Sequence, residues 1–123
     1  ADTAGLANPA LVDHVIRLLA DALPEATLSL HLHDTRGLGL ANMLAGLNAG
    51  VTVFDAAVGG LGGCPFIPKA TGNIATEDAA FMCARMGVET GIDFAKLRPV
   101  ALRLADMLER TLPSRMAYLA DAA

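Results

Sequence analysis

The amino-acid sequence predicts an α/β fold in which parallel strands alternate with helices. Apolar residues recur at helical spacing in several segments, short apolar runs lie between them, and the connections are short. Helices and strands that alternate in this way are typical of a parallel sheet covered by helices. The chain has 123 residues, of which 54% are hydrophobic, so it fits one domain or part of one.

The first helix is expected to begin at Asn8-Pro9, because proline at the first helical position loses no hydrogen bond. Pro24 ends this helix, and residues 28–33 follow as a short buried strand. Within the helix, apolar residues at helical spacing predict the face that packs on the core. They are Leu11, Val15, Leu18, Leu19 and Leu23.

A second helix is expected over residues 38–49, because Gly50 suits the left-handed position that follows a helix. Residues 51–58 are rich in β-branched side chains and predict a second buried strand. A loop then covers residues 59–72, which include five glycines and two prolines.

Two further helices are expected after this loop. Thr76 can cap a third helix that runs to about residue 86, and Glu77 and Asp78 place negative charge in its first turn. Asp93 can cap the last helix, which continues to about Leu112. The expected order of elements along the chain is therefore helix, strand, helix, strand, helix, helix.

Composition excludes several classes of function. No run approaches the 18 or so apolar residues of a membrane span, and the net charge of −4 gives no reason to expect a nucleic-acid partner. Two cysteines in an apolar chain do not predict a disulfide scaffold, so a reducing cytoplasm is the expected location. Residues 1–6 read as the end of a strand with its exit loop, which suggests a truncated domain.

His31 and His33 are the strongest candidate functional residues. Alternate residues of a strand point to the same face, so both imidazoles are expected side by side at the end of the strand, with Leu32 turned away. Active sites of α/β folds lie at this end, and two such histidines suit a metal ion. A pair of structural histidines explains the pattern equally well. Asp34 is a possible acceptor that orients one of the rings.

Two further candidates lie after the second strand. Cys64 stands at the end of a glycine-rich stretch, where a backbone free of side chains lets a ligand approach closely. Asn73 offers a neutral carbonyl oxygen, a ligand that suits Mg²⁺ or Mn²⁺, although a capping or turn role is the more common one. Cys83 lies in a helical apolar pattern and is expected in the core, whereas His14 is expected to face solvent.

Five short motifs occur in the order and at the spacing of one enzyme family, and on them the chain resembles the 3-hydroxy-3-methylglutaryl-CoA lyases from Asp2 to about Leu97. The glycine-cysteine motif is highly specific, whereas His-x-His-Asp alone is not. The motifs are His31-Leu32-His33-Asp34-Thr35, Leu40-Ala41-Asn42, Gly59-Gly60-Leu61-Gly62-Gly63-Cys64-Pro65, Thr71-Gly72-Asn73 and Ala75-Thr76-Glu77-Asp78.

Related barrel enzymes fit less well. Isopropylmalate and homocitrate synthases usually place Asn after the second histidine and carry a Gly-Glu-Arg type of loop in place of Gly62-Gly63-Cys64. Carboxyltransferase domains of biotin enzymes share His-x-His-Asp-Thr but lack the cysteine loop and the Gly-Asn pair. The cysteine loop therefore favours the lyases.

The resemblance implies a (β/α)₈ TIM barrel with a divalent metal, Mg²⁺ or Mn²⁺, at the C-terminal mouth of its strands. His31, His33 and Asn73 match three of the family's metal ligands, and the fourth, an Asp beside a catalytic Arg on the first strand, falls outside this chain. A whole barrel needs about 250 residues. Residues 1–123 are thus expected to form its C-terminal part, about the last three to four β/α units.

The resemblance also implies the reaction, which cleaves 3-hydroxy-3-methylglutaryl-CoA into acetyl-CoA and acetoacetate in leucine degradation and ketone-body formation. His31 matches the candidate that moves the hydroxyl proton, and Cys64 matches the thiol that protonates the enolate. The implied partners are an acyl-CoA substrate and a second copy in a homodimer, with neither nucleic acid nor membrane.

Two alternatives remain open from the sequence alone. One is a related Claisen-type synthase or carboxyltransferase barrel, and the other is a non-catalytic half-barrel that serves as an interaction module. We expect the 123 residues by themselves to be inactive and to associate, because a cut barrel has strand edges with unpaired backbone groups.

Overall fold

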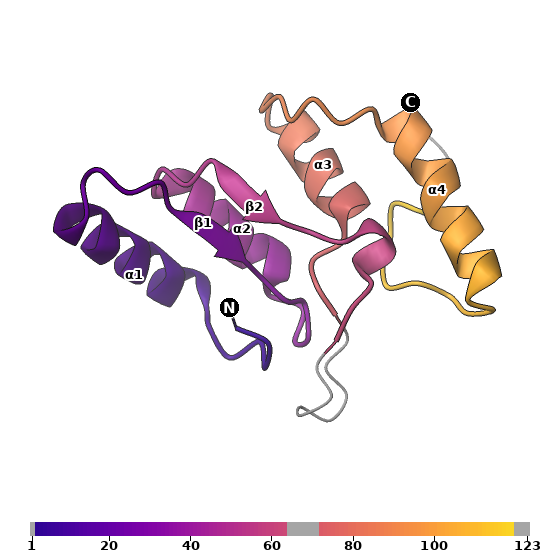
Figure 1. Ribbon diagram of the computed structural model, residues 1–123, viewed down its shortest axis with the longest axis horizontal. Coiled ribbons are helices and arrows are strands. Elements are labelled where there is room, and N and C mark those ends of the chain that lie inside the picture. Colours follow the sequence, from indigo (N-terminus) through magenta and orange to yellow (C-terminus); the bar gives the residue numbers. More distant parts are fainter. Residues whose placement is uncertain (1, 64–71, 120–123) are drawn as a thin grey trace.

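The computed structural model describes residues 2–63 and 72–119, and its elements alternate as the sequence predicts (Figure 1). Two parallel strands lie beside their helices, and the last two helices pack against each other at the other end of the molecule. In chain order the elements are α1 (Pro9–Ala22), β1 (Ser29–His31), α2 (Gly39–Asn48), β2 (Val53–Asp55), the 3₁₀ turn η1 (Val58–Gly60), α3 (Thr76–Arg85) and α4 (Phe94–Met107).

The two strands pair in parallel, with His31 of β1 opposite Asp55 of β2. Alternation along each strand gives the sheet two different faces. Leu30 and Phe54 point to the face that packs on the helices and join the apolar clusters there. His31 and Asp55 belong to the opposite face, which is the more exposed one in the described part of the chain. Functional side chains can therefore gather on that face.

Among the described residues, two clusters of buried apolar side chains lie on the helix side of the sheet. One joins Leu32 to α2 and α3 through Met43, Ile74, Ala79 and Cys83. The other joins α1 to the residues that precede β2 and contains Val12, Ile16 and Val51. Leu32, between the two candidate histidines, thus anchors β1 in the core, as its expected orientation requires.

Helix α1 forms where expected but buries a different face. Asn8 caps it by accepting a hydrogen bond from the Leu11 amide at 3.0 Å. Val12 and Ile16 are the buried residues, because α1 packs against α2 and the residues that precede β2. Leu11 and Leu18 of the predicted face are 50% and 56% exposed. The predicted core face of this helix is therefore wrong.

Both strands are shorter than predicted, because their regular pairing covers only three residues in each. The end of the first predicted strand instead meets the segment after the glycine loop, where the Ile74 amide donates to the Leu32 carbonyl at 3.1 Å. The second predicted strand ends in η1, which the sequence did not predict. Gly59 and Gly60 give this turn its positive φ angles of 68° and 70°.

The last two helices differ from prediction at their ends. Thr76 is the first residue of α3 and not its cap, which is Ala75 without a side-chain hydrogen bond. Asp93 does cap α4, by accepting from the Lys96 amide at 3.2 Å. This helix ends at Met107 and not near Leu112, because Glu109 takes a positive φ of 51° that no right-handed helix accommodates. None of the helices described is long and apolar enough to cross a membrane.

Candidate functional site

The structure brings His31 and His33 together at the end of β1. Their Nε2 atoms lie 3.1 Å apart, and the ring centroids are 5.1 Å apart with an interplanar angle of 66°. His33 is buried, with 7% of its surface exposed, and His31 is half-buried. The two rings therefore converge on one face of the sheet and present two nitrogen donors to the same point.

This spacing fits two neighbouring ligands of one metal ion. Donor atoms about 2.0–2.1 Å from an octahedral ion lie about 2.8–3.0 Å apart when they are neighbours. Around a tetrahedral ion with the same bond length they lie about 3.3–3.4 Å apart. The 3.1 Å between the two Nε2 atoms falls between these values, so the two nitrogens can bind one cation in either geometry.

Asn73 joins the pair through the backbone. It forms an isolated antiparallel bridge with His33, so both side chains stand on the same side of the pairing. The Asn73 Nδ2 group donates to the Leu61 carbonyl at 3.1 Å, whereas its Oδ1 atom is buried without a hydrogen-bond partner among the described residues. A buried carbonyl oxygen without a donor suits a cation.

The amide oxygen is essential to this candidate set. Within residues 2–63 and 72–119 no group of three or more His, Cys, Asp or Glu side chains can hold a metal ion. A site at this point would therefore use two imidazoles and one amide from the described chain, and further ligands from elsewhere. The residues present fit a divalent metal but supply only part of its coordination shell.

Burial keeps the His33 ring in the form that a metal ligand needs. Desolvation lowers the pKa of the His33 imidazole below its ordinary value, and the neighbouring His31 lowers it further. A neutral imidazole has a free lone pair, whereas a protonated one has none. The inner histidine of the pair is thus neutral at pH 7.

The carboxylate beside the pair is Asp55 and not the predicted Asp34. Asp55 Oδ2 lies 3.3 Å from His31 Nδ1 across the two strands. Asp34 instead accepts a hydrogen bond from the Gly39 amide at 2.8 Å, which fixes the turn into α2. Sequence reasoning missed Asp55, although a carboxylate inside the predicted strand over residues 51–58 offered the signal.

The sequence also did not reveal that the side chain of Glu77 holds the backbone at the start of the glycine loop. The buried Glu77 side chain accepts the Gly59 amide with both carboxylate oxygens, at 2.9 and 3.0 Å. The Gly59 carbonyl accepts from the Ser114 amide at 3.1 Å. Glu77 was expected only to charge the start of a helix. Its actual partner is the turn from which the loop departs.

Asp78 makes a similar connection to the C-terminal segment. Its carboxylate accepts the Ser114 hydroxyl at 2.7 Å and the amides of Arg115 and Met116 at 3.1 and 2.9 Å. The two acids of the first α3 turn thus hold the loop base and the segment after α4 in one network. Both acids are buried.

The other candidate residues, two cysteines and one histidine, have different outcomes. Cys64 lies outside the described residues, so its predicted role stays a prediction. Cys83 is buried in the core as predicted, and burial raises the pKa of its thiol. His14 is exposed on α1, also as predicted.

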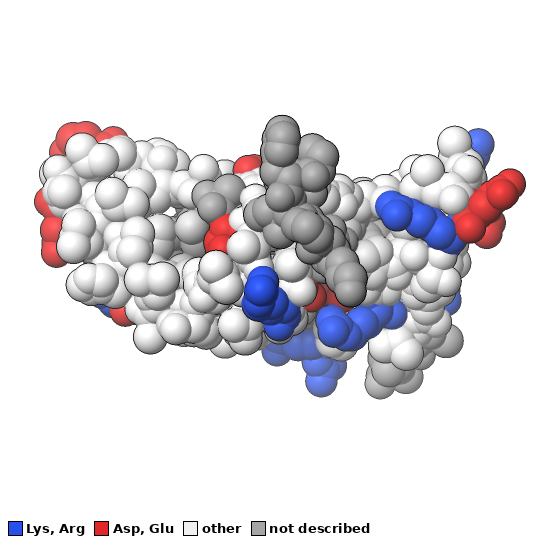
Figure 2. All heavy atoms as spheres, turned by 90° about the horizontal axis from the view of Figure 1, so that it is seen from below, with Lys and Arg blue, Asp and Glu red and all other residues white. Residues whose placement is uncertain are grey.

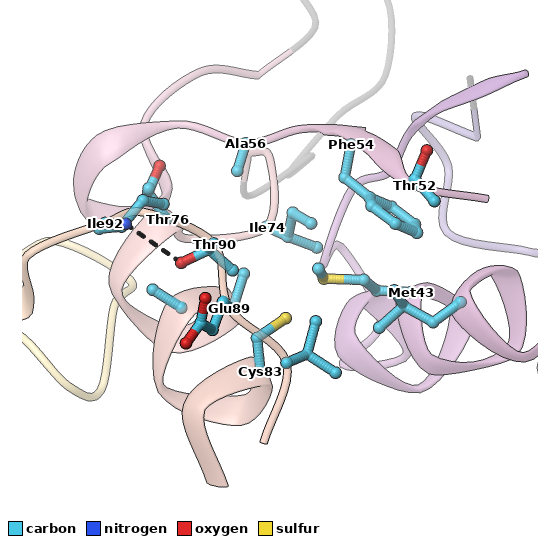
Figure 3. A pocket seen from close by; sticks show the side chains of 14 residues that line it. Met43, Thr52, Phe54, Ala56, Ile74, Thr76, Cys83, Glu89, Thr90 and Ile92 are labelled. Carbon is cyan, nitrogen blue, oxygen red and sulfur yellow. Dashed lines mark hydrogen bonds between the residues drawn. The ribbon is translucent and has the colours of Figure 1, made fainter. Parts of the chain in front are cut away.

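A cavity of about 410 Å³ lies on the other face of the sheet, between α2, β2, α3 and residues 88–92 (Figure 3). Met43, Phe54, Ile74 and Cys83 give it a mainly apolar lining. Because Phe54 and Asp55 alternate on β2, this cavity is separated from the histidine pair by the strand itself. It does not belong to the candidate site.

Figure 2 shows the molecule from below the view of Figure 1, the side toward which the base of the glycine loop projects. Most of the visible surface comes from uncharged residues, and Lys and Arg side chains gather along one edge. The acidic side chains visible there lie mostly toward the two ends of the molecule. This edge offers positive charge to an anionic ligand.

Comparison with known proteins identifies the family of this arrangement. A family model described as HMGL-like matches residues 1–104. The hydroxymethylglutaryl-CoA lyase YngG of Bacillus subtilis is 46% identical over 114 residues, which cover 93% of this chain and 38% of that protein. The (R)-citramalyl-CoA lyase of Chloroflexus aurantiacus is also 46% identical over 114 residues, covering 93% of this chain and 36% of that protein.

A comparison with solved structures points to the same family. The structure of an HMG-CoA lyase from Acinetobacter baumannii, in complex with coenzyme A and 3-methylmalate, matches with a TM-score of 0.93 and 43% identity. The match covers 99% of this chain and 40% of that one. The chain thus spans between a third and two fifths of the length of these relatives. Its parallel strands and alternating helices correspond to part of the lyase fold.

Proposed function

The chain belongs to the HMGL-like family, and from this premise we propose that the protein is a metal-dependent lyase that cleaves 3-hydroxy-3-methylglutaryl-CoA into acetyl-CoA and acetoacetate. In this proposal residues 1–123 form part of a closed (β/α)₈ barrel, and other parts of the protein complete the site. The observation that carries the proposal is the convergence of two imidazole nitrogens, 3.1 Å apart, where His33 pairs with Asn73, whose buried Oδ1 atom has no hydrogen-bond partner among the described residues.

His31, His33 and Asn73 are the residues that would hold the cation. A divalent ion, Mg²⁺ or Mn²⁺, supplies Lewis-acid chemistry that favours loss of a proton from a substrate hydroxyl. The chain orients the three donors by strand pairing and by the His33–Asn73 bridge. The buried position of His33 also keeps water away from its imidazole ring.

The remaining steps are proton transfers. The substrate hydroxyl loses its proton, the carbon–carbon bond breaks, and its electron pair forms the enolate of acetyl-CoA while the carbonyl of acetoacetate appears. His31 is our candidate for moving the first proton. If its Nε2 atom is a ligand and Nδ1 holds a proton, Nδ1 can take up the hydroxyl proton only after it has passed its own proton to Asp55, which faces it. Cys64 is our candidate for protonating the enolate.

A second substrate deserves equal testing, because the identity to the (R)-citramalyl-CoA lyase is the same 46% as to the hydroxymethylglutaryl-CoA lyase. The acyl group could therefore be that of citramalyl-CoA within the same reaction class. The basic edge of the surface in Figure 2 favours the anionic coenzyme A part common to both substrates. We further propose that the protein acts as a homodimer in the cytoplasm.

The proposal is tested on the protein as the organism makes it. Acetyl-CoA release is measured from both acyl-CoA substrates, after removal of metal and after addition of Mg²⁺ or Mn²⁺. We expect activity only with metal, and the larger kcat/KM identifies the substrate. Loss of activity in His33→Ala, but not in the exposed control His14→Ala, would support the assigned site. Full activity of the metal-free protein would refute the proposal.

A further inference from the structure

We infer that Asp55 is a positioning residue, which sets the tautomer and the orientation of His31 in the metal site. The inference rests on the proposed function for its consequence in metal binding. Its geometric basis, however, is independent of any bound ion, because it concerns two side chains of the described chain.

The strand register places the two residues together. His31 and Asp55 are direct partners in the parallel ladder between β1 and β2, so their side chains leave the sheet on the same face. Asp55 Oδ2 lies 3.3 Å from Nδ1 of His31, on the far side of the ring from the Nε2 atom that faces His33. One edge of the imidazole therefore meets a carboxylate while the other meets the second histidine.

This arrangement decides which nitrogen carries the proton. A neutral imidazole has one N–H group, and an ionised carboxylate can only accept hydrogen bonds. Asp55 thus favours the tautomer of His31 with the proton on Nδ1, which leaves a lone pair on Nε2. Because metal ions bind a neutral imidazole through its lone pair, Asp55 prepares Nε2 of His31 for a ligand role.

Other carboxylates near the pair are engaged elsewhere. Asp34 accepts the Gly39 amide at 2.8 Å, and Asp2 accepts the amides of Leu6 and Ala7 at 3.1 and 2.7 Å. Among the described residues, the Asp55 carboxylate has no hydrogen-bond partner except His31. Asp55 is thus the carboxylate that remains available to hold the ring.

The expected size follows from how such partners act in metal sites. Loss of a residue that hydrogen-bonds a metal-binding histidine typically weakens metal affinity by about 10–100-fold. The Asp55 side chain is 63% exposed, so water can replace part of its effect. We expect Asp55→Ala to raise the Kd for Mn²⁺ about tenfold, at the lower end of that range.

The experiment compares Asp55→Ala, Asp55→Asn and Asp106→Ala in the protein as the organism makes it. Asp106 is an exposed acid of α4 and serves as the matched control for loss of one negative charge. Manganese affinity is measured by electron paramagnetic resonance titration of metal-free protein. Long-range ¹H–¹⁵N correlation spectra of the metal-free protein report the tautomer of His31, assigned from the signal lost in His31→Gln.

We expect the Nδ1–H tautomer in the unmodified protein and in Asp106→Ala, and a shift toward Nε2–H in Asp55→Ala. Asp55→Asn keeps a carbonyl acceptor and should retain most of the Nδ1–H form. An Nε2–H tautomer in the unmodified protein, or an unchanged tautomer and Kd in Asp55→Ala, would overturn the inference. If no variant binds Mn²⁺, the proposed function fails, while the tautomer spectra still decide the role of Asp55.

Discussion

Beside the candidate site, Gly72 is the position at which substitution by alanine should lower the free energy of unfolding most. Its φ is +115°, and a Cβ atom there would lie 2.4 Å from the Gly60 carbonyl oxygen and 3.0 Å from that of Gly62. Both obstacles are backbone atoms, which cannot rotate away as a side chain can. The Gly72 carbonyl also accepts the Asp34 amide at 3.1 Å, so any displacement passes to the end of β1.

The cost of Gly72→Ala has two parts. Holding a residue with a side chain in a sparsely populated backbone region costs about 1–3 kcal/mol. Crowding in a packed region adds about 1–3 kcal/mol. The free energy of unfolding should therefore fall by about 2–6 kcal/mol, a large share of the 5–15 kcal/mol typical of a folded domain.

Gly87→Ala is the matched control, because Gly87 also has a positive φ, +73°, but a Cβ atom there meets nothing within 4 Å. Only the backbone cost applies to it, about 1–2 kcal/mol. Equilibrium urea unfolding of both variants measures the difference, and a Mn²⁺ titration shows whether Gly72→Ala also weakens metal binding through Asn73. Equal stabilities and equal affinities in the two variants would show that the close approach at Gly72 is unimportant.

Three further predictions concern single side chains. Cys64→Ser should lower kcat by about 10²-fold or more, the contribution typical of a general acid, whereas Cys83→Ser should keep near-normal turnover; a fully active Cys64→Ser enzyme would exclude the acid role. Glu77→Ala should destabilise the protein by about 1–3 kcal/mol, because the buried Gly59 amide loses its acceptor, and urea unfolding should give a smaller loss for Glu77→Gln, which keeps one oxygen. The lowered pKa of His33 implies stability that is present in full above the ordinary imidazole pKa of about 6.5 and is lost as the pH falls through the lower value of the folded state. Unfolding measured between pH 7 and pH 5 should show this fall, and a His33→Gln variant should lack its share of it.

The sequence predicted the order of the elements well because each signal was local. Proline and asparagine fixed the start of α1, the +97° φ of Gly50 follows the end of α2 as expected, and alternation along β1 placed both histidines on one face. These features depend on residues within a few positions of one another. Pattern and propensity describe such short-range relations directly.

What the sequence could not predict depends on distant contacts. The buried face of α1 was misassigned because the helix is apolar on more than one side, and only packing against α2 selects Val12 and Ile16. Glu77 and Asp78 were expected to charge the start of a helix, yet each accepts hydrogen bonds from backbone groups that lie far away along the chain. Asp55 was missed for the same reason, because its partner is on the neighbouring strand.

The antiparallel bridge between His33 and Asn73 has a consequence for how such a site can diverge in evolution. The two residues are 40 positions apart in the chain, but the bridge and the hydrogen bonds on either side of it hold their backbones next to each other. The Leu61 carbonyl, which accepts the Asn73 Nδ2 group at 3.1 Å, adds a second constraint on the amide. A substitution that breaks the bridge should therefore displace the amide oxygen and the inner imidazole together. The two candidate donors can diverge only as a unit.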